Sequence, residues 1–467
     1  MDGFPIMGVP NSGDTAWMLA SAALVLLMTP GLAFFYGGMV RAKGVLNMVM
    51  MSISAMGLVT VLWVIYGFSM SFANDTAHLF GNPTQFLGLK GMITPVSGAA
   101  AIAAVPASGT TAAVAAVPEV DVPLFGTIPA LVFVMFQLMF AIITVALVSG
   151  AVADRLKFGS WLVFAGLWAT VVYFPVAHWV FDFDVKDAGG NIIHHGGWIA
   201  NQLKAIDFAG GTAVHINSGA AGLALCIVLG KRKGWPGTLV RPHNLPFVML
   251  GAGLLWFGWY GFNAGSATSS NGAAGSTFVT TTVATAAAML AWLLTERIRD
   301  GHATSLGAAS GIVAGLVAIT PSCSSVNVVG ALAIGVVAGI ACALAVGLKF
   351  KFGFDDALDV VGVHLVGGLF GTLMVGLVAA PETFAGVAGL FYGGGWSQLG
   401  KQAIGAGAVL LYSAIGTAIL GLIVKYTVGL RLDREDEASG IDESEHAESS
   451  YDFATAGTGS VLGRSEV

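Results

Sequence analysis

The sequence predicts an all-α integral membrane protein with eleven transmembrane helices. We expect a five-plus-five inverted repeat, with the N-terminus outside and the C-terminus inside. The 467-residue chain is 56% hydrophobic and only 10% charged, whereas soluble proteins carry about 25% charged residues. It also contains 65 glycines, and small residues let membrane helices approach closely. A short pattern built around a histidine occurs twice in the chain.

Eleven apolar runs are long enough to cross a membrane, because a hydrocarbon core roughly 30 Å thick requires about 20 residues of helix. In chain order they cover roughly residues 16–37, 45–72, 128–151, 159–181, 208–230, 245–263, 275–295, 303–320, 327–348, 358–380 and 403–428.

Residues 96–118 are also apolar, but we assign them to a loop. They are mostly alanine and include Pro106, Ser108 and Gly109, a combination typical of loops. Lys and Arg favour cytoplasmic segments. With eleven spans, sixteen of the 20 Lys and Arg residues fall inside, and a twelfth span would mix the charges. We therefore predict one long extracytoplasmic loop at 73–127. The four basic residues outside are Lys90, Lys186, Lys204 and Lys401.

The two ends of the chain differ in character. The N-terminal region lacks the basic start and short apolar core of a signal peptide, and its first apolar run ends in Arg41 and Lys43, so we predict a true span. From about residue 429 the chain becomes acidic and polar. The expected organisation is a transmembrane domain at 1–428 and a cytoplasmic tail at 429–467. The net charge of −6 argues against nucleic-acid binding.

The repeated pattern places a histidine eight residues after an aspartate. Asp207 precedes His215 in the fifth run, and Asp356 precedes His364 in the tenth. Because five spans is an odd number, the two halves would cross the membrane in opposite directions. Inverted repeats of this kind place a substrate site near the membrane midplane. Glycines follow each histidine at the same two offsets, namely Gly219, Gly222, Gly368 and Gly371.

His215 and His364 are the ionisable residues predicted deepest in the membrane. At a rise of 1.5 Å per residue, each lies about 12 Å from its own side of the core. Such residues are functional candidates by default, and the alternative is two separate histidines satisfied by neighbouring hydroxyls or carbonyls. We expect no metal site, because no third ligand lies at matching depth. We expect no cofactor, and the enzyme signatures H-E-x-x-H and G-x-S-x-G are absent from the sequence.

A neutral imidazole pair would suit a small neutral molecule. Burial disfavours a charged imidazolium, and two imidazoles that share one hydrogen bond leave one donor and one acceptor facing the lumen. Ammonia has both hydrogens and a lone pair, so it fits such a pair. A bare ion would lose its hydration shell without replacement.

Four segments carry a resemblance to a known family, namely DFAGGTAVHINSGAAGL, RPHNLPFVMLGAGLLWFGWYGFNAGS, GALAIGVVAG and DVVGVH. They resemble the Amt/Mep/Rh family of ammonium transporters, and the resemblance covers nearly the whole chain. It implies an eleven-helix bundle with an inverted repeat, usually a homotrimer in the cell membrane with one pore per subunit. The substrate would be ammonium or ammonia, with methylammonium as an analogue, and the protein would not be an enzyme.

The resemblance also implies roles for individual residues. His215 and His364 resemble the twin histidines of the pore. Aromatic faces attract a desolvated cation, although packing would be the default role of any phenylalanine in a membrane helix. The outer site that recruits ammonium would comprise Phe140, Phe181, Ser266 and Asp207, with Asp207 in a structural role. The gate and lumen would be lined by Phe136, Phe140, Phe262 and Trp259.

One position departs from the family pattern. The family usually has a tryptophan three residues after the histidine that ends the fourth span, and here that residue is Phe181, in the segment AHWVFDFD. Trp179 is expected to face another side of the helix. The recruitment site is therefore predicted to lack its usual indole.

The tail resembles the family's cytoplasmic C-terminal region, except that Ala447 stands where the family commonly has glycine. The resemblance implies packing under neighbouring subunits and regulation, often with a PII-type signal protein. The alternative is an acidic tail without a specific role. Residues 454–467 are mainly small and polar, and we expect no specific role for them. The family-like tail residues are Gly429, Arg431, Gly440, Asp442 and Tyr451.

Two other functions share this fold. A passive Rh-type gas channel would not need an outer site suited to a cation. An ammonium sensor would be favoured by a fused signalling domain, for which the tail is too short.

Overall fold

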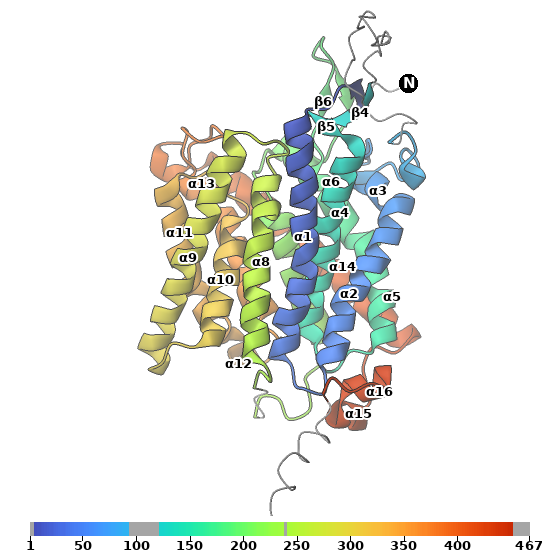
Figure 1. The fold of residues 1–467 in the computed structure, drawn as a ribbon, viewed down its shortest axis with the longest axis vertical. Coiled ribbons are helices and arrows are strands. Elements are labelled where there is room, and N and C mark those ends of the chain that lie inside the picture. The colour runs from blue at the N-terminus through green and yellow to red at the C-terminus, as the bar shows by residue number, and fades with distance from the viewer. Residues whose placement is uncertain (1–3, 93–120, 238–240, 452–467) are drawn as a thin grey trace, which may run out of the picture.

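The computed structural model describes residues 4–92, 121–237 and 241–451, which form a bundle of long helices running along one direction (Figure 1). Among the described residues, ten helical spans are long and apolar enough to cross a membrane, and the shorter apolar helix α10 lies among them. The chain is therefore a multi-pass membrane protein. A helix occupies each of the eleven predicted runs, and the crossing of α10 stays a prediction.

Several spans are built from two or three helical segments joined without a break. In the first half, the helices are α1 (Ser12–Met39), α2 (Val45–Leu62) with η1 (Trp63–Gly67) and α3 (Phe68–Phe72), α4 (Ala130–Val148) with η3 (Ser149–Val152), α5 (Phe158–Trp168) with η4 (Ala169–Tyr173) and α6 (Phe174–Phe181), and η6 (Gly211–Ile216) with α7 (Asn217–Leu229). In the second half, they are α8 (Leu245–Gly265), α9 (Gly272–Asp300), α10 (Ser305–Ile319), α11 (Val328–Ala345), α12 (Leu348–Phe352), η7 (Val361–Leu365) with α13 (Val366–Val378), and α14 (Ser397–Thr427).

Short strands gather at one end of the bundle, which we call the strand end (Figure 1). Strand β1 (Ile6–Gly8) pairs antiparallel with β4 (Val122–Phe125), which pairs with β5 (Ile128–Pro129). Two hairpins complete this end: β2 (Asp75–Thr76) with β3 (Phe80–Gly81), and β6 (Val185–Lys186) with β7 (Ile192–His194). Short turns lie at η2 (Leu87–Leu89), η5 (Ile199–Leu203) and η8 (Leu390–Tyr392).

The predicted loop at 73–127 is only partly described. Its described ends contain the β2–β3 hairpin, η2 and β4. Residues 93–120, and with them the rejected span at 96–118, lie outside the described residues.

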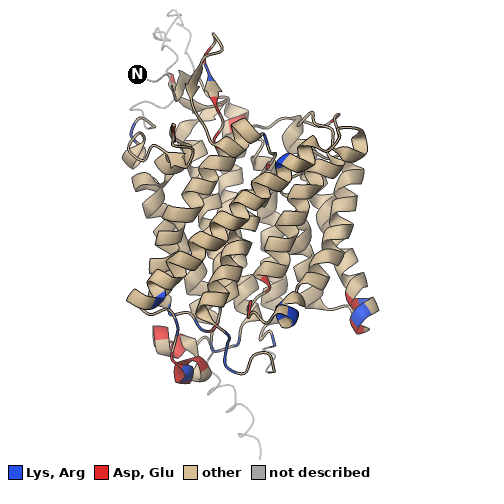
Figure 2. Ribbon diagram, turned by 180° about the vertical axis from the view of Figure 1, so that it is seen from behind, with Lys and Arg blue, Asp and Glu red and all other residues tan. Residues whose placement is uncertain are grey.

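Charged side chains avoid the middle of the bundle. Figure 2 shows Lys, Arg, Asp and Glu mainly at the two ends of the helices, with the band between them almost entirely uncharged. The end opposite the strands carries the tail helices α15 (Arg434–Ser439) and α16 (Ile441–His446), and we call it the tail end. This distribution is expected of a protein whose middle faces hydrocarbon.

The tail packs beneath helices of its own chain. The carboxylate of Asp442 accepts hydrogen bonds from the backbone N–H groups of Leu46 (3.1 Å) and Asn47 (2.8 Å), so it caps the start of α2. The first N–H groups of a helix otherwise lack partners. Tyr451 shares a hydrogen bond of 2.9 Å with His243. Two of the predicted tail residues, Asp442 and Tyr451, therefore contact the helical bundle.

Arg431 and the two glycines shape the path of the tail. Arg431 pairs with Glu437 at 2.6 Å, and Glu437 also accepts a hydrogen bond from the backbone N–H of Lys233 at 2.6 Å. Gly429 and Gly440 have φ angles of +85° and +136°, which glycine adopts without steric cost. Ala447 also has a positive φ, +55°, where the resembled family commonly has glycine. Residues 454–467 lie outside the described part of the chain.

The substitution Asp442→Ala should detach α16 from the start of α2 without preventing membrane insertion. Losing a helix-capping side chain costs about 0.5–2 kcal/mol. We expect faster hydrogen exchange at the amides of Leu46 and Asn47, measured by mass spectrometry in detergent. The matched control is Glu448→Ala, because Glu448 is exposed on the same tail. Unchanged exchange in the Asp442 variant would show that this cap does not hold the tail.

Candidate functional site

The two predicted histidines meet in the interior of the bundle. His215 lies in η6 and His364 in η7. Their Nδ1 atoms are 3.2 Å apart, and their rings lie 5.3 Å apart at an angle of 26°. The side chains are nearly fully buried, with 1% and 3% of their surface exposed. One Nδ1 must donate and the other accept, so this contact fixes one tautomer of each ring.

Each histidine lies in a π-helical segment that follows an aspartate. The carboxylate of Asp207 accepts hydrogen bonds from four backbone N–H groups, those of Gly210 (2.9 Å), Gly211 (2.6 Å), Thr212 (2.8 Å) and Ala213 (3.0 Å). Burial raises the pKa of Asp207, and these four donors partly oppose that effect. The carboxylate of Asp356 similarly accepts from Val361 at 2.7 Å. Each aspartate therefore caps the segment that presents a histidine.

The repeated glycines allow the two segments to touch. A Cβ atom on Gly219, four residues after His215, would lie 2.5 Å from the backbone nitrogen of Leu365. A Cβ atom on Gly368, four residues after His364, would lie 2.9 Å from the carbonyl oxygen of Gly211 and 3.1 Å from Cβ of His215. The contacts are reciprocal, because each glycine packs against the segment that carries the other histidine.

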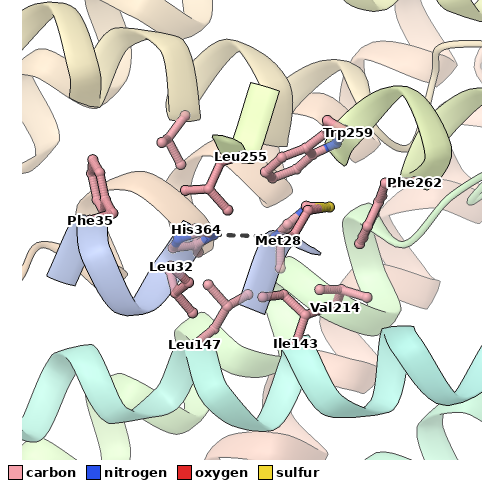
Figure 3. A pocket seen from close by; sticks show the side chains of 12 residues that line it. Met28, Leu32, Phe35, Ile143, Leu147, Val214, Leu255, Trp259, Phe262 and His364 are labelled. Carbon is pink, nitrogen blue, oxygen red and sulfur yellow. Dashed lines mark hydrogen bonds between the residues drawn. The ribbon is translucent and has the colours of Figure 1, made fainter. Parts of the chain in front are cut away.

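A narrow cavity runs past the histidine pair (Figure 3). Its other lining residues are apolar or aromatic, and the indole N–H of Trp259 is already donated to Thr320 at 2.9 Å. The imidazole nitrogens are therefore the main hydrogen-bonding groups available to a molecule in this cavity. The lining residues are Met28, Leu32, Phe35, Ile143, Leu147, Val214, His215, Leu255, Trp259, Phe262, Val313 and His364.

Aromatic rings cluster around Phe262, which lines the cavity. The rings of Phe140 and Phe262 are 4.3 Å apart, and Phe136 packs edge-on against Phe140 at 5.0 Å. The ring of His215 is stacked at 5.4 Å on Trp259 and at 6.0 Å on Phe262. The aromatic residues predicted for the gate and lumen thus form one continuous cluster with the histidine pair.

The remaining predicted residues lie around Phe140 and at the end of α8. Phe181 packs edge-on against Phe140 at 6.1 Å. Ser266 is half-buried and donates its hydroxyl hydrogen to the carbonyl of Phe262 at 2.8 Å, which leaves its oxygen free to accept. Trp179 faces elsewhere, because its indole donates to the carbonyl of Leu79 at 2.8 Å.

Much of the apolar lining was not singled out from the sequence. In α4, Phe136 and Phe140 share one helix face with Ile143 and Leu147, since the four lie at i, i+4, i+7 and i+11. This spacing was visible in the sequence. The contributions of α1 and α10, and that of Leu255 in α8, were not visible, because nearly every face of those helices is apolar.

Comparison with known proteins identifies relatives along the whole chain. The model of the Ammonium Transporter Family matches residues 16–451. An ammonium transporter of Mycobacterium tuberculosis is 73% identical, over 99% of this chain and 94% of the relative. One of Aquifex aeolicus is 45% identical, over 95% and 94%.

Solved structures of the same kind share the fold. Saccharomyces cerevisiae Mep2 is 30% identical, with a TM-score of 0.75 over 91% of this chain and 88% of that chain. A protein described as Sensor Amt Protein is 26% identical, with a TM-score of 0.78 over 93% and 98%.

The substitution Asp207→Ala should destabilise the fold rather than remove only a surface charge. It leaves four backbone N–H groups without their acceptor, and each unsatisfied buried group costs about 1–3 kcal/mol. We expect the thermal unfolding midpoint in detergent to fall by several degrees, with a smaller fall for Asp207→Asn. The control is Asp187→Ala in the exposed β6–β7 hairpin. An unchanged midpoint in Asp207→Ala would contradict the capping role.

Proposed function

The chain belongs to the ammonium transporter family, and we propose on this premise that it carries ammonium across the cell membrane. The supporting observation is the hydrogen-bonded pair of His215 and His364 beside an otherwise apolar cavity. A transporter needs a passage rather than a reaction centre, so we propose no enzymatic activity and no resident cofactor.

We propose that α10 is the eighth of eleven spans, and that the strand end is extracytoplasmic and the tail end cytoplasmic. The basic residues favour this orientation, because cytoplasmic segments are enriched in Lys and Arg. The reciprocal contacts of Gly219 and Gly368 favour an inverted repeat. In this arrangement, residues 1–428 form the transmembrane domain and 429–467 a regulatory cytoplasmic tail.

The outer site is proposed to recruit the cation. Ammonium that has shed part of its water would contact the faces of Phe140 and Phe181, and it would donate a hydrogen bond to the hydroxyl oxygen of Ser266. Aromatic faces attract such cations by about 0.5–2 kcal/mol each. Asp207 supports the site without touching substrate, because its oxygens are already occupied by four backbone N–H groups.

We propose that the substrate passes through the cavity as ammonia. Ammonium releases one proton to solvent at the outer site, and the rings of Phe140 and Phe262 move apart to admit the neutral molecule. In the cavity, ammonia can donate to one imidazole nitrogen and accept from another, with Phe136 and Trp259 lining the way. A charged ion would meet no ring of oxygen atoms there to replace its hydration shell.

We further propose that the chain forms a homotrimer and that its tail is regulatory. The tail contacts at Asp442, Arg431 and Tyr451 tie it to three cytoplasmic segments of the bundle, so a change in the tail could alter the helices above it. A PII-type signal protein at the tail end is the proposed partner.

The second candidate is an ammonium sensor. One similar structure is described as a sensor, and a sensor would bind ammonium at the same outer site but carry little of it. A passive Rh-type gas channel is less well supported, because a neutral gas would not need aromatic faces and a hydroxyl at the entrance. Measured uptake by the purified protein in vesicles separates a transporter from a sensor.

Replacing both His215 and His364 by alanine should abolish selective ammonium transport. The change removes the hydrogen-bonding groups from the cavity while leaving its apolar lining. Uptake into proteoliposomes should fall to background, with trimer assembly unchanged in size-exclusion chromatography. The control pair is Cys226→Ala with Cys342→Ala, which alters buried residues away from the cavity lining. Wild-type rate and selectivity in the histidine double variant would refute the mechanism.

Recruitment should depend on Phe140 and Ser266. Their double substitution by alanine should raise the KM for methylammonium at least about fivefold, because a cation–π contact and a hydrogen-bond acceptor are both lost. Phe181→Trp should lower KM, since an indole is the stronger cation–π partner. KM is measured by radiolabelled uptake. An unchanged KM in both variants would mean that the outer site lies elsewhere.

A further inference from the structure

Four titratable side chains form a continuous buried network at the strand end, beside Phe181. Nε2 of His178 lies 3.0 Å from a carboxylate oxygen of Asp75, and its Nδ1 lies 3.2 Å from an oxygen of Asp182. The other oxygen of Asp182 lies 2.8 Å from Nε2 of His194. The side chains of both histidines are 0% exposed, and those of Asp182 and Asp75 are 4% and 12% exposed.

The geometry favours a His178 that is protonated on both nitrogens. In addition to Asp182, Nδ1 faces the carbonyl oxygen of Ser71 at 3.3 Å, so both ring nitrogens face only acceptors. A neutral imidazole donates through one nitrogen and would turn the lone pair of the other toward these oxygens. An imidazolium donates through both, and the two carboxylates balance its buried charge.

This network joins three segments that are distant in sequence. Asp75 belongs to β2, His178 and Asp182 belong to the end of α6, and His194 belongs to β7. The segment that follows β7 packs directly on α6, because a Cβ atom on Gly197 would clash with the carbonyl oxygen of His178. The ring of Phe4 stacks on His194 at 4.2 Å and covers the network.

Phe181 lies within the turn of α6 that this network holds. It follows His178 by three residues and directly precedes Asp182. Its ring packs against Phe140 at 6.1 Å. Any movement of the last turn of α6 relative to the hairpins would therefore move Phe181 relative to Phe140.

We propose that doubly protonated His178 is a positioning residue for the outer ammonium site, because it clamps the last turn of α6 and so places Phe181 against Phe140. This inference rests on the proposed role of Phe181. Loss of one proton would leave a lone pair facing an oxygen, loosen the turn and weaken ammonium recruitment at alkaline outside pH. The groups facing His178 are Asp75 and Asp182, and those two carboxylates are contacted in turn by His78 and His194.

The test is the KM for radiolabelled methylammonium in proteoliposomes between about pH 6 and pH 8.5, a range that brackets ordinary histidine titration. Methylammonium stays protonated throughout, so its own titration does not interfere. The wild-type KM should rise at least about threefold across this range. In His178→Gln, KM should be raised by about the same factor at pH 6 and should no longer depend on pH, with kcat nearly unchanged. A His178→Gln variant with the KM and pH profile of the wild type would overturn the inference.

Two further variants separate a positioning role of His178 from a general destabilisation of the protein. His195 is an exposed histidine on the same hairpin, so His195→Gln should have the KM and the pH dependence of the wild type. A rise in KM equal to that of His178→Gln would contradict the positioning role of His178. Should His178→Gln not assemble, Asp75→Asn removes one partner and should give a smaller rise in KM with a weaker pH dependence, and a wild-type profile would again overturn it.

Phe181→Ala distinguishes a failure of the proposed outer site from a failure of the proposed role of His178. It should raise KM at pH 6, and His178→Gln should add nothing in the double variant. If Phe181→Ala leaves KM unchanged, the outer-site assignment is wrong and this inference falls with it. If Phe181→Ala raises KM whereas His178→Gln does not, the inference alone is wrong.

Discussion

The hydrogen bond between the Nδ1 atoms of His215 and His364 brings together polar groups that are 149 residues apart in the chain. In an apolar interior, an unpaired polar atom costs about 1–3 kcal/mol, so each imidazole needs the other. Their segments can touch only because Gly219 and Gly368 carry no side chain at the crossing. The positions of α7 and α13 follow from this contact, and α1, α4, α8 and α10 supply the apolar lining around it.

The proposed transport path passes through two different environments, an entrance and a cavity. At the proposed entrance, Phe140, Phe181 and Ser266 would offer ring faces and an oxygen, which suit a cation. In the cavity, the lining offers imidazole nitrogens among apolar side chains, which suits a neutral molecule with one lone pair. The Phe140–Phe262 contact at 4.3 Å separates the two. Selectivity would thus come from the order in which the substrate meets these groups, because charge is favoured first and excluded afterwards.

Sequence reasoning predicted the long helices, because apolar runs of membrane length are unambiguous, and it predicted the histidine pair, because the Asp-to-His spacing repeats. It misjudged several helix ends. The seventh run was expected to stop at 295, but α9 continues to Asp300, where Arg299 donates to the carbonyl of Ala343 at 2.7 Å. Charge marks the end of the apolar zone and not the end of the helix.

Other features could not be predicted from one sequence. The π-helical form of η6 and η7 depends on capping by Asp207 and Asp356 and on packing between the halves, none of which alters the apolar pattern. The network around His178 joins loops whose pairing is long-range. The strands at the strand end are only two to four residues long, too short for an alternation of apolar and polar residues to predict them.

The central claim is that a substrate crosses beside two imidazoles in a cavity that cannot hold a bare ion. It is tested most directly by methylammonium uptake into proteoliposomes of the purified wild-type protein, measured with increasing K⁺ outside at constant ionic strength, together with K⁺ flux in the same vesicles. We predict that uptake is unaffected by a large excess of K⁺ and that no K⁺ flux accompanies it. Competition by K⁺, or a protein-dependent K⁺ flux of comparable size, would contradict the account.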